Sequence, residues 1–459
     1  KKCRNLKLNF GIDMKQEKSQ NHRLNGLKDD TEQKSVSSEQ SEQIRDSDNK
    51  QGWEIKKLGE VCETGAGGTP LKTHKDYYEG GTIPWLLSGE VSQGEIFEAK
   101  NFITEKGLKN SSAKLFPPNT VLVAMYGATA GQVGILRFEA ATNQAVCGIL
   151  PNDRTIPEYL FYCFLSKKEE LVAQAVGGAQ PNISQIKIKN IKIPLPPLPE
   201  QQRIVSILDE AFAAIAKAKA NAEQNLKNAK ELFESYLQGV FENKVDGWEE
   251  KKLGEVFEMK PPKKEAKEKL SDNDLVSFLP MEDLGICENE IKPEKEKPLK
   301  DIAGSYTYFA ENDVLLAKIT PCFENGKLGV AKNLINGIGF GSSEYIVFRC
   351  PENVVPEFLF YFLSRESLRE EGKKYMSGAV GHKRVSKDWI ENYPFTFPKS
   401  KTDQQTIVCQ LDALRAETQK LEAVYQQKIA DLDELKKSIL QKAFAGELKM
   451  DSVKVAQTA

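Results

Sequence analysis

Two long stretches of the chain carry apolar residues at alternating spacings of three and four. Each stretch follows a related junction, PLPPLPEQQRIVSILDE at 194–210 and FPKSKTDQQTIVCQLDA at 397–413. A narrow apolar stripe with this spacing is typical of a coiled coil. Proline cannot continue a helix backwards, so each helix should start sharply. We predict helices over residues 200–244 and 402–447, each about 60 Å long at 1.5 Å per residue.

The two stripes should pack against each other, because a lone apolar stripe would stay exposed to water. Antiparallel pairing is favoured, since each helix follows its own globular segment, and the two segments would then lie at opposite ends of the pair. The predicted pairing residues are Ile204, Leu208, Ala211, Ile215, Leu226 and Phe233 in the first helix, and Ile407, Leu411, Leu414, Leu421, Ile429, Leu432 and Ile439 in the second.

The globular segments before the helices are also related, so the chain contains an internal repeat. The repeat pairs GWEIKKLGEV (52–61) with GWEEKKLGEV (247–256), and PEYLFYCFLS (157–166) with PEFLFYFLS (356–364). Short β-rich runs bounded by Gly, Pro and Asn predict strands, and the segments opened by a proline predict helices. We therefore predict an α+β fold, with two pseudo-twofold-related mixed α/β domains at 51–199 and 245–401 separated by the antiparallel helix pair.

Composition limits the class of protein. The segment 1–50 is polar and predicts a disordered tail, and 448–459 forms a second tail. Lys and Arg (64) nearly balance Asp and Glu (66), so any contact with nucleic acid must use local basic patches. The eight cysteines include no CxxC pair, which predicts thiols in a cytoplasmic protein and no metal site. No apolar run reaches the ~20 residues that a membrane span needs.

These features resemble the specificity subunit of type I restriction-modification enzymes. The resemblance rests on the paired starts, the stretches 67–86 and 178–209, and the repeated long helices. It implies that each domain recognises half of a bipartite, asymmetric DNA sequence and that the helices act as spacer and as docking surface. It further implies two methylation subunits and restriction or translocase subunits as partners, with S-adenosylmethionine, ATP and Mg on those partners and no cofactor or catalytic residue on this chain.

Candidate DNA contacts in the first domain are cationic, hydroxyl, amide and aromatic side chains. A glycine-bounded loop mixes groups that bind phosphates and stack on bases, and two amides suit adenine. Solvated surface residues are the alternative for each group. The candidates are Lys72, Thr73, His74, Lys75, Tyr77 and Tyr78 in the loop, Gln180, Asn182, Ser184, Lys187 and Lys189 further on, and Tyr126 and Arg137 near strand ends.

The second domain has PPKKEAKEKLSDND at 261–274 where the first has its glycine-rich loop. Its most basic short patch comprises His382, Lys383, Arg384, Ser386 and Lys387, and Lys318 and Lys327 lie near strand ends. We predict that Arg384 recognises guanine through O6 and N7. Its replacement by alanine should weaken binding at the second half-site and leave the preference of the first half-site intact.

Two alternatives remain. A stand-alone DNA methyltransferase is disfavoured, because the sequence lacks an NPPY or DPPY tetrad, a Walker lysine loop and an HExxH helix. A structural coiled-coil scaffold would explain the long helices, but would leave the divergent polar loops of the two domains without a purpose.

Overall fold

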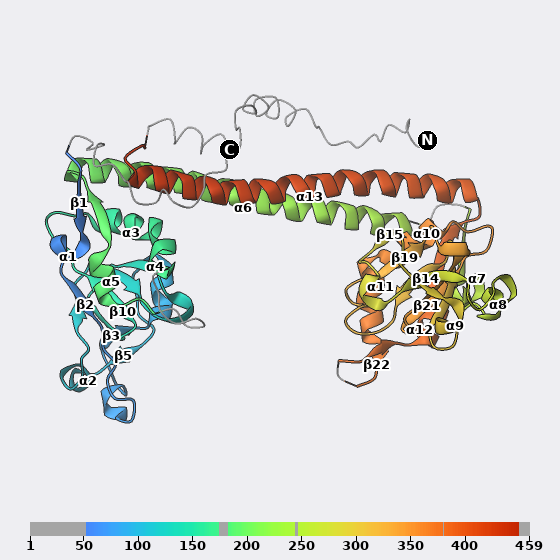
Figure 1. Cartoon of the computed structure of the whole chain (residues 1–459), viewed down its shortest axis with the longest axis horizontal. Coiled ribbons are helices and arrows are strands. Elements are labelled where there is room, and N and C mark those ends of the chain that lie inside the picture. Colours follow the sequence, from blue (N-terminus) through green and yellow to red (C-terminus); the bar gives the residue numbers. More distant parts are fainter. Residues whose placement is uncertain (1–51, 174–181, 244–246, 380, 449–459) are drawn as a thin grey trace. The chain divides into compact units, whose positions relative to one another are not determined.

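The computed structural model of the 459-residue chain describes residues 52–173, 182–243, 247–379 and 381–448 (Figure 1). They fall into two compact units. The first unit holds the described residues up to Glu223 and those from Gln427 on, and the second holds the residues from Gln224 to Gln426. Each unit therefore contains one globular body and a part of each long helix, and we describe each unit by itself.

The first body contains a five-stranded sheet in the order β2-β10-β7-β8-β4 and a four-stranded sheet in the order β5-β3-β9-β6. Only the pairs β4/β8 and β3/β9 are parallel among the strand pairs described in these two sheets. The strands are β2 (Thr64–Ala66), β3 (Ile83–Leu86), β4 (Glu95–Ile96), β5 (Phe102–Ile103), β6 (Leu115–Phe116), β7 (Val121–Ala124), β8 (Val133–Leu136), β9 (Ala140–Thr142) and β10 (Val146–Ile149).

The second body repeats this topology. Its sheets have the orders β13-β21-β18-β19-β15 and β16-β14-β20-β17, again with one parallel pair in each, β15/β19 and β14/β20. The repeat therefore extends to the four-stranded sheets. The strands are β13 (Glu258–Met259), β14 (Leu275–Leu279), β15 (Glu288–Ile291), β16 (Lys295–Pro298), β17 (Thr307–Ala310), β18 (Val314–Ala317), β19 (Leu328–Ala331), β20 (Ile338–Gly341) and β21 (Tyr345–Arg349).

Short helices cover the sheets in both bodies, and Pro157 and Pro356 each occupy the start of one, where proline is favoured. A two-stranded sheet closes each body: β1 (Glu54–Lys57) pairs with β11 (Lys192–Leu195), and β12 (Trp248–Lys252) pairs with β24 (Pro394–Pro398). The main short helices are α3 (Pro157–Ser166), α4 (Lys168–Ala173) and α5 (Gln185–Asn190), with the counterparts α10 (Pro356–Ser364), α11 (Glu366–Lys374) and α12 (Lys387–Asn392).

The long helices are α6 (Leu198–Glu242) and α13 (Lys401–Phe444). In the first unit, the beginning of α6 and the end of α13 share one buried cluster that contains Leu208 and Leu432. In the second unit, the end of α6 and the beginning of α13 share another, which contains Leu237 and Leu411. An ion pair of 2.7 Å joins Lys219 to Asp433. The predicted antiparallel pairing is therefore confirmed.

Most of the predicted pairing residues lie in this seam. Ile204, Leu208, Ala211, Ile215, Leu411, Leu414, Leu432 and Ile439 are buried, whereas Leu226, Phe233, Ile407 and Ile429 are half-buried. Leu421 is an exception, since it is 38% exposed and the prediction for it is wrong. The apolar stripe of a helix drifts around the helix axis, because 3.6 residues per turn do not match a seven-residue repeat. Thr418, at 2% exposure, is the buried residue one turn before it.

The cysteines depart in one respect from the expected state. Six of the described cysteines are free thiols, and burial raises the pKa of Cys147 and of Cys163 to about 12. Cys409, in contrast, is disulfide-bonded. Within the described residues, no group of three or more His, Cys, Asp or Glu side chains could hold a metal ion. None of the described helices combines the length and the apolar character that crossing a membrane requires.

Candidate DNA interface

Each body is attached to its own long helix by a buried glutamine. The side-chain oxygen of Gln201 accepts a hydrogen bond from the backbone N–H of Ile156 (3.0 Å), and its amide donates to the carbonyls of Arg154 and Pro196. In the second body, the side-chain oxygen of Gln404 accepts from the backbone N–H of Val355 (2.8 Å), and its amide donates to the carbonyls of Asn353 and Pro398. Both glutamines have no exposed surface.

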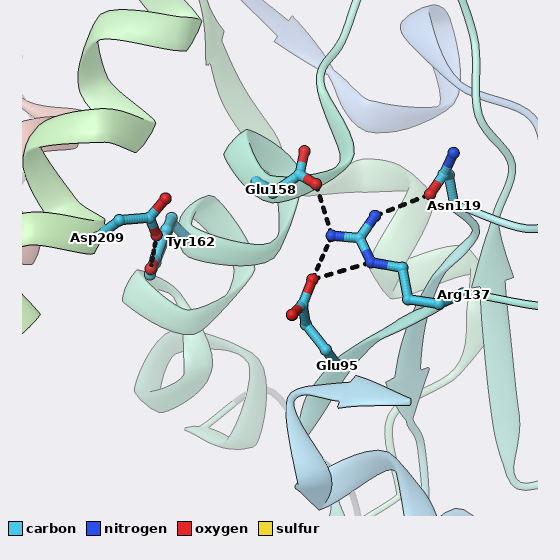
Figure 2. A network of polar contacts seen from close by, with 6 residues as sticks. All are labelled: Glu95, Asn119, Arg137, Glu158, Tyr162 and Asp209. Atoms are coloured by element: carbon cyan, nitrogen blue, oxygen red, sulfur yellow. Dashed lines mark hydrogen bonds and ion pairs between the residues drawn. The ribbon is translucent and has the colours of Figure 1, made fainter. Parts of the chain in front are cut away.

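A tyrosine–aspartate pair reinforces each attachment. The Tyr162 hydroxyl donates to Asp209 of α6 at 2.5 Å (Figure 2), and the Tyr361 hydroxyl donates to Asp412 of α13 at the same distance. Neither the glutamines nor the tyrosine–aspartate pairs were predicted as functional residues from the sequence. The signal was the glutamine, leucine and aspartate that both junctions share, in QQRIVSILD and QQTIVCQLD.

The end of the other long helix also packs on each body. Phe444 of α13 contacts Tyr159 with ring centroids 5.3 Å apart, and Phe241 of α6 contacts Phe358 at 5.2 Å. Tyr159 and Phe358 occupy the same place in the repeat, two residues after the helix-starting proline. Each body is therefore fixed to the beginning of one helix and to the end of the other.

The predicted loop of the first body presents its cations to solvent. Lys72, Thr73, His74 and Lys75 are exposed, and His74 stacks on Tyr77 with ring centroids 4.8 Å apart. Tyr77 is only 8% exposed, and the Tyr78 hydroxyl donates to the carbonyl of Pro70 at 2.5 Å while its ring packs on Trp85. The prediction that these two tyrosines stack on bases is therefore corrected: both rings support the loop.

A second group of candidates gathers at one end of β7. Tyr126 and Asn182 form a β-bridge, and both side chains are exposed. Ser184 is the N-cap of α5 and accepts from the backbone N–H of Lys187, which gives it a structural role. Lys189 is exposed on the same helix, and Lys187 is half-buried. Gln180 lies outside the described residues.

Arg137 is corrected from a DNA contact to a structural residue. Its guanidinium donates to Asn119 (2.8 Å) and to Glu158 (2.6 Å), and it also binds Glu95 (Figure 2). In the second body, Lys332 donates to Asn312 (2.6 Å) and pairs with Glu357 (2.8 Å). The two asparagines both have a left-handed backbone, with φ of 69° and 68°. Because the cluster is present in both bodies, it belongs to the shared fold.

In the second body, the basic patch lies just before β23 (Arg384–Val385), on β23 itself and at the start of α12, and β23 pairs with β22 (Met376–Ser377). His382, Lys383, Arg384 and Lys387 are exposed. The Arg384 guanidinium donates to Glu344 from Nε (2.9 Å) and Nη2 (2.6 Å), so a guanine would have to replace this carboxylate. Ser386 caps α12 as Ser184 caps α5, and Lys387 pairs with Glu391 at 3.1 Å.

The two remaining lysines of the second body are partly engaged. Lys318 donates to the carbonyl of Ser343 (3.0 Å) and lies 3.9 Å from Glu344. Lys327 donates to the carbonyls of Met281 (2.7 Å) and Glu282 (3.2 Å), so it holds a loop and its predicted role as a DNA contact is corrected. Tyr375, which the sequence analysis missed, is 52% exposed and stacks on Trp389 beside the patch.

The surviving candidates can hold phosphates and contact base edges. They are lysines, two histidines, a threonine, an arginine, an asparagine and a tyrosine that stay accessible on loops and strand ends, where nucleic-acid contacts are commonly placed.

Comparison with known proteins identifies the family of the chain. The family model described as "Type I restriction modification DNA specificity domain" matches residues 50–227 and again residues 245–430. The chain belongs to this family. Each match includes one body and most of the long helix that follows it, so the two copies of the specificity domain coincide with the internal repeat.

Curated specificity subunits are similar to the chain over parts of their length. The MjaIX specificity subunit of Methanocaldococcus jannaschii is 30% identical over 54% of this chain and 62% of its own length. The EcoR124I/EcoR124II specificity subunit of Escherichia coli is 30% identical over 34% of this chain and 40% of its own. The chain thus spans less than two thirds of the length of these relatives.

Two solved structures share the fold over nearly their whole length. A chain from a type I R-M system superposes with a TM-score of 0.68 at 22% identity, covering 87% of this chain and 99% of that one. The HsdS subunit from Thermoanaerobacter tengcongensis gives a TM-score of 0.56 at 21% identity, covering 87% and 98%. The specificity-subunit fold, with its repeated mixed α/β bodies and long helices, is therefore the fold of this chain.

Proposed function

We propose that this chain is the DNA-recognition subunit of a type I restriction-modification complex. Each body recognises one half of a bipartite, asymmetric DNA sequence. The single observation that carries the proposal is the double match of the DNA specificity domain, at 50–227 and 245–430, on two bodies of the same topology. The exposed groups differ between the bodies, which suits two halves of different sequence.

The partners follow from the same proposal. The long helices dock two methylation subunits, which bind S-adenosylmethionine, and restriction or translocase subunits supply ATP- and Mg-dependent cleavage. The chain itself supplies no catalytic group and acts in the cytoplasm. The exposed Leu421 (38%) and Val424 (53%) on α13 give the helix an accessible apolar surface for such docking.

A stand-alone methyltransferase and a DNA-free scaffold remain the competing functions. Methyl transfer from S-adenosylmethionine to DNA by the purified chain would favour the methyltransferase. A scaffold would retain no DNA at low salt, whereas a DNA-recognition subunit should retain DNA with a steep dependence on salt.

A selection experiment tests the proposal directly. The purified full chain is incubated with a pool of random duplex DNA, and the retained duplexes are sequenced. We expect two short enriched blocks at a fixed distance, because two linked binding sites act on one DNA molecule at high effective concentration. Retained duplexes without any enriched block would contradict the proposal.

A further inference from the structure

The second body contains a cavity of about 420 Å³ with a strongly cationic lining. Four lysines line it: Lys260 beside β13, Lys263 before α8 (Lys264–Lys269), Lys318 after β18 and Lys387 at the start of α12. Among the described residues that line the cavity, none is Asp or Glu. Elements far apart in the sequence thus bring four positive charges to one small volume.

The positive charge of these lysines is only partly neutralised, since Lys387 pairs with Glu391 at 3.1 Å and Lys318 lies 3.9 Å from Glu344. Lys263 donates to the carbonyl of Gly304 at 2.8 Å, and burial together with the nearby Lys260 and Lys267 lowers its pKa. Lys318 likewise donates to a carbonyl, and its carboxylate neighbour Glu344 is 3.9 Å away and pairs more closely with Arg384. An anion in the cavity would relieve the mutual repulsion of these lysines.

The rest of the lining suits the apolar part of a ligand. Met259, Ile346, Val347 and Val385 supply apolar surface, and Tyr306 supplies an aromatic ring. Ser305, Thr307 and Ser343 add hydroxyl groups that can bind a sugar or a phosphate. A cavity of roughly 300–1,000 Å³ is typical of small-molecule sites, and a mixture of cations, hydroxyls and apolar surface matches a nucleotide.

The first body is closely packed at the equivalent place. The aligned segments KKLGEVCETGAGG (56–68) and KKLGEVFEMKPPK (251–263) put Gly65 opposite Lys260 and Gly68 opposite Lys263. A Cβ added at Gly68 would lie 2.3 Å from the backbone nitrogen of Ala113, so no side chain fits there without movement. The divergent segment of the second body therefore supplies two of the four lysines.

We propose that this cavity binds a nucleoside phosphate. Its lysines hold the phosphate, and its apolar wall and Tyr306 hold the base or sugar. Lys387 also belongs to the basic patch. We therefore favour the DNA strand at the second half-site as the source of the nucleoside phosphate, a choice that rests on the proposed function. A free nucleotide is the other source of the same chemistry.

The test compares two variants of the full chain that each remove two positive charges from the same segment. The cavity variant is Lys260→Ala with Lys263→Ala, and the control is Lys264→Ala with Lys269→Ala, two exposed residues outside the lining. Binding of a fluorescent adenosine monophosphate and of duplex DNA is measured by anisotropy over a range of salt. Lys260→Arg with Lys263→Arg keeps the charge, and circular dichroism confirms that each variant is folded.

We expect the cavity variant to bind the mononucleotide at least tenfold more weakly, or to lower the salt slope of DNA binding by about 1–2, since each lost phosphate contact contributes about 0.9. The control and the arginine variant should change neither.

A loss for DNA alone assigns the site to the DNA strand, and a loss for the mononucleotide alone assigns it to a free nucleotide. If the cavity and control variants behave alike with both probes, the inference is overturned. A chain that binds the mononucleotide through these lysines but retains no DNA would contradict the proposed function and leave the cavity site standing.

Discussion

The side-chain oxygen of Gln404 accepts a 2.8 Å hydrogen bond from the backbone N–H of Val355. Val355 immediately precedes Pro356, the first residue of α10, so its N–H needs a partner outside that helix. The same side chain also donates to two carbonyls, which makes it the link between α13 and the second body. Gln201 forms the equivalent link between α6 and the first body.

Replacing Gln404 by leucine should destabilise the second unit by at least about 3 kcal/mol. The substitution leaves one buried N–H and two carbonyls without partners, and each such group costs on the order of 1–3 kcal/mol. Hydrogen exchange of the α10 amides measures the loss locally. Gln405→Leu, at an exposed neighbouring position, is the matched control. Equal protection of α10 in both variants would show that the glutamine does not fix this junction.

Arg137→Ala should destabilise the first body and leave the salt dependence of DNA binding unchanged. The guanidinium is 20% exposed and connects Glu95, Asn119 and Glu158, so its loss leaves carboxylates without a counter-charge. We expect a cost of about 1–3 kcal/mol from the lost charged hydrogen bonds. Thermal unfolding and DNA anisotropy on the same sample measure both effects. A lower salt slope at unchanged stability would return Arg137 to the DNA contacts.

The pair of Arg384 and Glu344 predicts a pH dependence. The hydrogen bonds from Arg384 lower the pKa of Glu344. A lowered carboxylate pKa stabilises the fold above the unfolded value, about 4.3 for glutamate, and this contribution is lost as the pH falls through the folded pKa. Wild type should therefore melt at a higher temperature than Glu344→Gln at pH 7, and the difference should close below about pH 4. A difference that stays constant down to pH 3 would rule out the ion pair as its source.

Periodicity and repetition predicted most of the fold. The apolar stripes located α6 and α13, because an apolar stripe must be buried against a partner. The antiparallel direction followed from the globular segment that precedes each helix. The prediction that Leu421 takes part in the helix pairing was wrong. A strict seven-residue repeat does not follow the gradual rotation of the apolar stripe around the helix axis. The repeated segments predicted two related bodies. In the structure, every strand of the five-stranded and four-stranded sheets of one body has a counterpart in the other body.

The chemistry of individual side chains was less predictable. Arg137 and Arg384 were both predicted to contact DNA, with Arg384 preferred, but their carboxylate partners Glu95 and Glu344 lie about 40 residues away in sequence. Tyr77 and Tyr78 looked accessible because they occur in a polar loop, although both rings pack inside it. Comparing the two copies would have helped, since Lys332 repeats two of the three contacts of Arg137, and Gln404 repeats those of Gln201.

The central claim is that each body recognises one half of a bipartite sequence. A methylation map of DNA from cells that carry this chain with its methylation subunits tests the claim most directly, with the wild type compared against Arg384→Ala. We predict two short blocks at a fixed gap in the wild type, and a relaxed or changed second block beside an unchanged first block in the variant. A single uninterrupted motif, or a variant in which both blocks change together, would contradict the claim.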